Sequence, residues 1–148
     1  MANLLLNYAG QEHWSSDEAQ RSSYRQYLTD TIREVWLQFD QKFRTLWNEH
    51  GIDRLASSLP SYKNDYMRRL LQDAVGFAGC KMVRRIVGLA HVADIDRIPD
   101  PAAREKAQRL ALAIGTSLIR MNRSVRSIEE MIDTTVSAIH NKSSIERK

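Results

Sequence analysis

Residues 67–89 have the sequence MRRLLQDAVGFAGCKMVRRIVGL, and this stretch decides the fold class. Its apolar residues return at intervals of three and four, which is the period of an α-helix and not of a strand. Those residues are Met67, Leu71, Ala74, Val75, Ala78, Met82, Ile86 and Leu89. The stretch predicts a helix that begins near Ser61 and ends near Gly88. Gly76 and Gly79 within it either kink the helix or allow another element to approach closely.

The same period extends in both directions, so we predict an all-α chain. Before the central stretch, residues 2–9 predict a short buried helix that is closed near Gly10, and Ser15 with Glu18 has the spacing of a capping box that opens a long helix. An aromatic-rich stripe follows, which we expect to be buried against a partner surface. Its members are Tyr24, Leu28, Ile32, Val35, Trp36, Phe39, Phe43, Leu46 and Trp47.

After the central stretch, residues 90–100 read as an ordered loop, and a helix is expected from about Pro101. The predicted inner face of that helix consists of Leu110, Ala113, Ile114, Ser117, Leu118 and Met121. Ser127 and Glu130 form a second capping box, which predicts a last amphipathic helix that frays by Asn141.

Composition excludes several classes of protein. The chain has 148 residues, 43% of them apolar, which is enough for one domain with a core. A net charge of +4, spread along the chain, is too weak to indicate a nucleic-acid partner. The single cysteine, Cys80, cannot form an internal disulfide, which favours a reducing cytoplasm. The leucine run at residues 4–6 is too short for a signal peptide or a membrane span, so no membrane partner is expected.

Arg84 and Arg85 are the candidate binding residues. Arg85 lies 18 residues after Met67, which is five helical turns, so it shares the apolar face, whereas Arg84 points about 100° away. A guanidinium on an apolar face requires an anionic partner. One interpretation is a structural ion pair with Asp94, Asp96 or another carboxylate. The other is that both arginines lie at a phosphate-bearing site, where their planar forks suit bidentate contact.

The remaining reactive side chains indicate no catalytic or metal site. His91 is expected to cap a helix or pack in the core, with an acid/base role as the alternative. His13, His50 and His140 lack the spacing of a metal site. Cys80 is expected to be a small buried thiol. The sequence contains no glycine-rich phosphate loop, no His-Gly-Asp type catalytic loop and no Asp-Phe-Gly or Asp-Pro-Glu type metal motif.

Residues 75–95, VGFAGCKMVRRIVGLAHVADI, closely resemble the C-terminal signature of the S-methyl-5-thioribose kinases. Residues 2–8 and 33–49 are similar to the segments that surround this signature in the family, and the resemblance extends to about Met121. It implies that residues 1–121 are the helical part of the C-lobe of a protein-kinase-like small-molecule phosphotransferase. Residues 122–148 would then be an additional amphipathic helix and frayed tail.

The resemblance also implies an activity and a partner. Enzymes of this family transfer the γ-phosphate of ATP to the 1-hydroxyl of methylthioribose in methionine salvage, and their paired arginines at the sugar-phosphate end match Arg84 and Arg85. ATP and Mg²⁺ are implied for the complete enzyme, but their binding segments belong to the part of the family upstream of Ala2. We therefore expect this chain to be inactive alone and to require the missing N-terminal kinase half, or a homo-oligomer, as its partner. The alternative is a non-enzymatic helical interaction module that uses the aromatic stripe.

Overall fold

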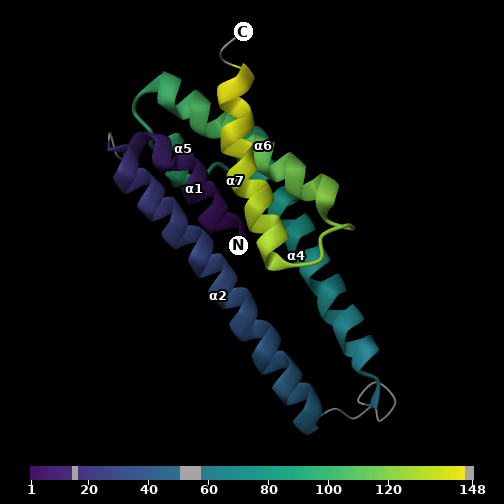
Figure 1. Cartoon of the computed structure of the whole chain (residues 1–148). Helices are drawn as coiled ribbons and strands as arrows, with labels where there is room; N and C mark the ends of the chain where they lie inside the picture. The colour runs from purple at the N-terminus through teal and green to yellow at the C-terminus, as the bar shows by residue number, and fades with distance from the viewer. Residues whose placement is uncertain (15–16, 51–57, 146–148) are drawn as a thin grey trace.

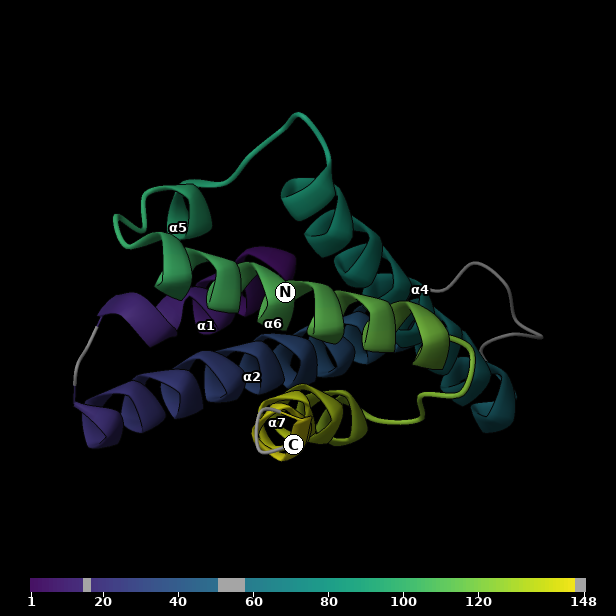
Figure 2. The same ribbon diagram turned by 90° about the horizontal axis from the view of Figure 1, so that it is seen from above.

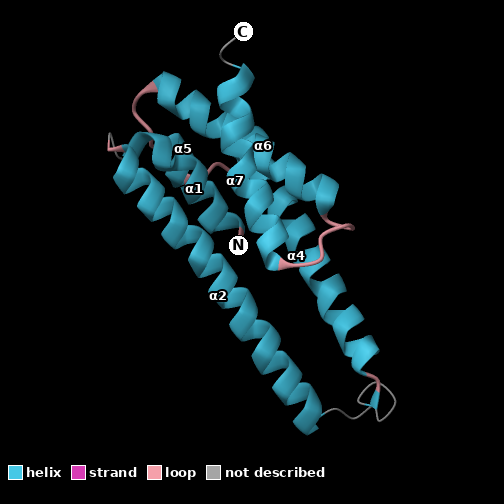
Figure 3. Cartoon of the chain, in the orientation of Figure 1, coloured by secondary structure: helices cyan, strands magenta, loops and turns pink. Residues whose placement is uncertain are grey.

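The computed structural model describes residues 1–14, 17–50 and 58–145, with the side chains of residues 12 and 140–145 excepted. The helices are α1 (Ala2–Trp14), α2 (Glu18–His50), α4 (Pro60–Val87), α5 (Ala93–Asp96), α6 (Pro101–Met121) and α7 (Ile128–Ile145). No strand occurs in the described ranges, which Figure 3 colours as helices and loops alone. The predicted all-α class is therefore confirmed.

The core lies where α1, α4 and α6 meet. Helix α6 packs against both α4 and α1, and α1 also contacts α2, so that α1 lies between α2 and α6 (Figures 1 and 2). Leu6 of α1, Met82 of α4 and Ile114 of α6 are each fully buried there. Burial of one such side chain contributes about 1.5–3 kcal/mol relative to exposure.

Helix α1 is longer than the sequence indicates. It continues to Trp14, so the prediction that it ends near Gly10 is wrong. Gly10 is buried, and a Cβ atom at this position would lie 2.7 Å from the carbonyl oxygen of Asp94 in α5. The glycine therefore allows α5 to approach α1 and does not close the helix.

Gly79 of α4 also allows a close approach, in this case of α6. A Cβ on Gly79 would lie 2.6 Å from the carbonyl oxygen of Gly115 and 2.9 Å from Ile119 Cγ1, both in α6. Of the two interpretations of Gly79, close approach of another element is the one that the structure supports. The narrow spacing between α4 and α6 depends on the missing side chain.

The expectation that the aromatic stripe of α2 is buried is wrong for most of its length. Leu28 and Ile32 are buried, but Val35 is 63% and Leu46 is 56% exposed. At the far end, Phe43 stacks on Tyr66 of α4, with ring centroids 5.6 Å apart. The reason is length: α2 has 33 residues and spans ~50 Å, whereas α1, its N-terminal neighbour, has 13 and spans ~20 Å.

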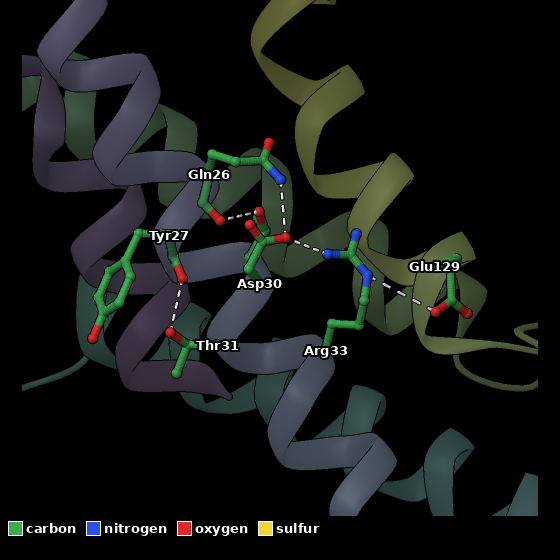
Figure 4. Close-up of polar contacts among 7 residues, drawn as sticks. Gln26, Tyr27, Asp30, Thr31, Arg33 and Glu129 are labelled. Atoms are coloured by element: carbon green, nitrogen blue, oxygen red, sulfur yellow. Dashed lines mark hydrogen bonds and ion pairs between the residues drawn. The ribbon is translucent and has the colours of Figure 1, made fainter.

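Helix α7 packs against α6 and α2. Ile128 and Met131 of the helix, and Val125 just before it, are almost fully buried and help to attach it to the core. Arg33 of α2 pairs with Asp30 and approaches Glu129 of α7 with Nε and Oε1 3.9 Å apart (Figure 4). All three side chains are at least one-third exposed, so this network contributes about 0–1 kcal/mol.

Capping groups fix two helix starts. The Ser127 hydroxyl accepts a hydrogen bond from the Glu130 amide at 3.2 Å, as predicted, and the Glu130 carboxylate accepts one from the Arg126 amide at 2.9 Å. Asp100 accepts a hydrogen bond from the Ala103 amide at 2.8 Å and caps α6. The predicted capping residue Ser15 lies outside the described residues.

Three local predictions are corrected. Residues 90–100 contain the short helix α5, whose Ile95 is fully buried and anchors it on the core. Ala113 of α6 is exposed, because the helix turns Ala107, Ala111 and Gly115 inward instead. Helix α7 extends past Asn141 to Ile145. Within the described ranges, no helix is both long and apolar enough to cross a membrane.

Candidate functional site

The C-terminal end of α4 carries both candidate arginines. The helix ends at Val87, and the Gly88 amide donates to the carbonyl oxygen of Arg84 at 3.0 Å. A Cβ atom on Gly88 would lie 2.5 Å from that oxygen, so only glycine fits this helix end, and the predicted end at Gly88 is confirmed. Cationic side chains in the last turn also interact favourably with the helix dipole.

Arg85 holds the turn that follows the helix. It is half-buried, and its Nη1 donates to the carbonyl oxygen of Ala90 at 2.9 Å, with that of His91 at 3.5 Å. The predicted ion pair with Asp94 or Asp96 is wrong. The Asp94 carboxylate accepts a hydrogen bond from the side-chain Nδ2 of Asn7 at 3.1 Å, and Asp96 Oδ2 lies 3.6 Å from Nδ1 of His91. Two backbone carbonyls therefore supply the negative potential that its position on the apolar face requires.

Arg84 faces a different environment. It is exposed and lines an open groove of about 480 Å³ between α1 and α4. The other lining residues are Met1, Ala2, Ala74, Phe77, Ala78, Cys80 and Lys81. Burial, and to a lesser extent the Lys81 ammonium, lowers the pKa of the Met1 amino group. The groove therefore combines an apolar floor with closely spaced cations, an arrangement that can hold an anionic group.

Two further residues, Lys81 and Phe77, line the groove, and neither was assigned a role from the sequence. Lys81 and Arg84 are three residues apart, so helical spacing alone places them on one face. The contribution of Met1 and Ala2 depends on how α1 packs against α4, for which the sequence carries no local signal. Cys80 is exposed in the same groove, so the prediction of a buried thiol is wrong. The reason is that Cys80 lies two residues before the buried Met82 and therefore faces outward from the helix.

The histidines do not converge on one site. His91 is exposed, and the amide that caps α4 is that of Gly88, so the expected capping or core role of His91 is wrong. His13 contacts the Trp14 ring edge to face, and His50 Nε2 lies 3.8 Å from Glu49 Oε2. The side chain of His140 lies outside the described residues. In the described part of the chain, no three His, Cys, Asp or Glu side chains are grouped so that they could hold a metal ion.

A second cavity, of about 300 Å³, lies between α1, α2 and α7 and is lined by Tyr8, Arg21 and Arg25 among others. Arg25 Nε donates to the carbonyl oxygen of Tyr8 at 3.2 Å, and the guanidinium lies 5.2 Å from the centroid of the Tyr8 ring. Burial raises the pKa of the Tyr8 hydroxyl, and the charge of Arg25 partly opposes this. These contacts attach α2 to α1.

Known proteins match this chain over most of its length. It is 34% identical to methylthioribose kinase 2 of Oryza sativa subsp. japonica and 37% identical to the methylthioribose kinase of Enterobacter sp. (strain 638). Each match covers 89% of this chain and 33% of the relative. The methylthioribose kinase of Bacillus pumilus (strain SAFR-032) is 34% identical, and the match covers 89% of this chain and 31% of that protein. No family model matches.

The share of each relative that the match covers shows how this chain is related to the methylthioribose kinases. The chain spans about a third of the length of these curated relatives, which is consistent with the C-terminal portion that the signature at residues 75–95 indicates. The chain is thus a homologue of part of the methylthioribose kinases.

Proposed function

We propose that this chain is the helical C-terminal part of an ATP-dependent S-methyl-5-thioribose kinase and is inactive alone. The observation that carries the proposal is the match to methylthioribose kinases over 89% of the chain but only about a third of each relative. In the complete enzyme, the γ-phosphate of ATP passes to the 1-hydroxyl of methylthioribose, as one step of methionine salvage in the cytoplasm. Residues 1–121 would belong to the helical C-lobe and residues 122–148 would form an additional helix and tail.

The two arginines have different proposed roles within one substrate site. Arg84 is exposed in the groove between α1 and α4, so its guanidinium is accessible to the sugar-phosphate end of the substrate. Arg85 donates to the carbonyl oxygen of Ala90 and so stabilises the turn that follows α4. Its other guanidinium nitrogens could contact the same anion. Neither arginine transfers a proton; they neutralise and orient the phosphate.

The described residues form no assembled group of metal ligands. Mg²⁺ is held by carboxylates and phosphate oxygens, and in the described ranges no three His, Cys, Asp or Glu side chains are grouped so that they could hold a metal ion. The groove beside Arg84 has no carboxylate among its lining residues. We therefore assign ATP and Mg²⁺ binding to the portion of the methylthioribose kinases that the match to this chain does not cover.

One observation favours a second function, a non-enzymatic helical interaction module. Val35, Phe39 and Leu46 of α2 are 63%, 42% and 56% exposed, and contiguous apolar surface of this kind marks interaction sites. Self-association of the chain, without any gain of kinase activity on complementation, would favour this function over the first.

Complementation tests the proposal. The chain is co-expressed with the upstream two thirds of the Enterobacter methylthioribose kinase, and ATP-dependent phosphorylation of methylthioribose is measured. We expect no turnover by either part alone, turnover by the pair, and loss of turnover when Arg84→Ala is introduced. The matched control supplies the Enterobacter enzyme's own C-terminal third. Robust turnover by the isolated chain, or failure of the pair while the control pair is active, would overturn the proposal.

A further inference from the structure

Two grooves meet at the start of α1, which lies between α2 and α4 (Figure 1). The groove of about 480 Å³ on the α4 side is lined by Met1 together with Phe77 and Lys81. A second groove, of about 210 Å³ on the α2 side, is lined by Met1, Leu4, Ile32, Val35, Trp36 and Phe39. Because Met1 borders both grooves, the grooves form one surface, which we call the Met1 surface. Its accessible residues include Met1, Val35, Phe39 and Phe77.

The Met1 surface is apolar and uncovered. Phe77 is 78%, Val35 is 63% and Phe39 is 42% exposed. Single exposed apolar residues are ordinary, but these side chains border adjoining grooves on two helices. Val35 and Phe39 are four residues apart, so they lie on one face of α2. An extended apolar surface of this kind is typical of a region that is buried in an assembled protein.

The lining residues also specify the charge of the occupant. Both grooves together contain the cations of Lys81 and Arg84 and no carboxylate. A second copy of this chain, placed symmetrically on the same surface, would present the same cations and no acidic partner for Lys81. An occupant with an apolar centre and a carboxylate at its edge complements the surface better.

We propose that the Met1 surface is the docking site for the upstream two thirds of a methylthioribose kinase, which contributes apolar side chains opposite Val35 and Phe77 and a carboxylate opposite Lys81. This inference rests on the proposed function. The relatives are about three times as long as this chain, so the remainder of such an enzyme must cover part of it. Arg84 lies at the edge of the docking site, so the substrate site is completed only when the two parts meet.

The test measures association directly, separately from turnover. The chain is titrated with the purified upstream fragment of the Enterobacter enzyme, and the Kd of the complex between the two is determined by anisotropy. We expect Val35→Asp and Phe77→Asp each to raise Kd by about tenfold or more, since an unpaired charge would be buried on docking. Leu37→Asp is the matched control: Leu37 is 47% exposed, and its position lies about 200° around α2 from Val35. Its Kd is expected to stay within about twofold of the wild-type value.

The possible outcomes distinguish the docking proposal from the proposed function. All three substituted residues are exposed, and melting curves by circular dichroism verify that the variants fold. If Val35→Asp or Phe77→Asp does not fold, Val35→Ser or Phe77→Ser replaces it. Equal binding by all variants would overturn the Met1 surface while the proposed function stands. Failure of the wild-type chain to bind would overturn both. Light scattering that shows a dimer, converted to a monomer by Val35→Asp, would make a second copy the occupant and overturn the docking proposal.

Discussion

Replacement of Gly79 with alanine tests whether the close contact between α4 and α6 controls stability. The added Cβ would meet the Gly115 carbonyl oxygen at 2.6 Å and the Ile119 amide nitrogen at 3.0 Å. Both are backbone atoms of α6, so relief requires that the two helices separate. Overpacking of this kind costs about 1–3 kcal/mol. The higher helix propensity of alanine offsets about 0.5–1 kcal/mol of that cost. The midpoints of these two ranges give an expected net loss of stability of about 1 kcal/mol, within limits of about 0–2.5 kcal/mol.

Gly76→Ala is the matched control, because it is three residues earlier in the same helix and equally buried. Its Cβ would meet Asn122 Nδ2 at 2.8 Å, which is the movable end of a side chain, and Asn122 Cβ at 3.3 Å, which needs a shift of only a few tenths of an ångström. Urea unfolding followed by circular dichroism should show that Gly79→Ala is less stable than wild type and that Gly76→Ala is within about 0.5 kcal/mol of it. A Gly79→Ala protein as stable as wild type, or a larger loss at Gly76, would refute this account of the helix contact.

Three further predictions follow from named contacts. Asp100→Ala removes the cap of α6 and should cost about 1 kcal/mol in urea unfolding, whereas Asp100→Asn should cost less than half of that. Tyr8 has a raised pKa in the folded state, so folding favours its protonated form. The free energy of unfolding should therefore fall as the pH rises above 10, which is the pKa of tyrosine in the unfolded chain, and this fall should be smaller in Tyr8→Phe. Arg85→Ala should accelerate amide hydrogen exchange in residues 88–92, and Arg84→Ala should leave that exchange unchanged.

The candidate site was only partly predictable, and the two arginines show why. Their positions on α4 and the helix end at Gly88 follow from residue spacing, because a helix converts sequence distance directly into direction. The partners of Arg85 do not follow, since the path of residues 88–92 decides which carbonyl oxygens reach its guanidinium. Likewise, the groove beside Arg84 exists only because the start of α1 packs against α4.

By itself, the sequence determined the all-α class, the end of α4 and the cap at Ser127, because all of these depend on interactions within a few residues. The tertiary structure alone decided which apolar faces are buried. The stripe of α2 has the pattern of a core face, yet Val35 is 63% exposed. The reason is that a helical period shows only that one face of the helix is apolar. It carries no information on whether a neighbouring helix is long enough to cover that face.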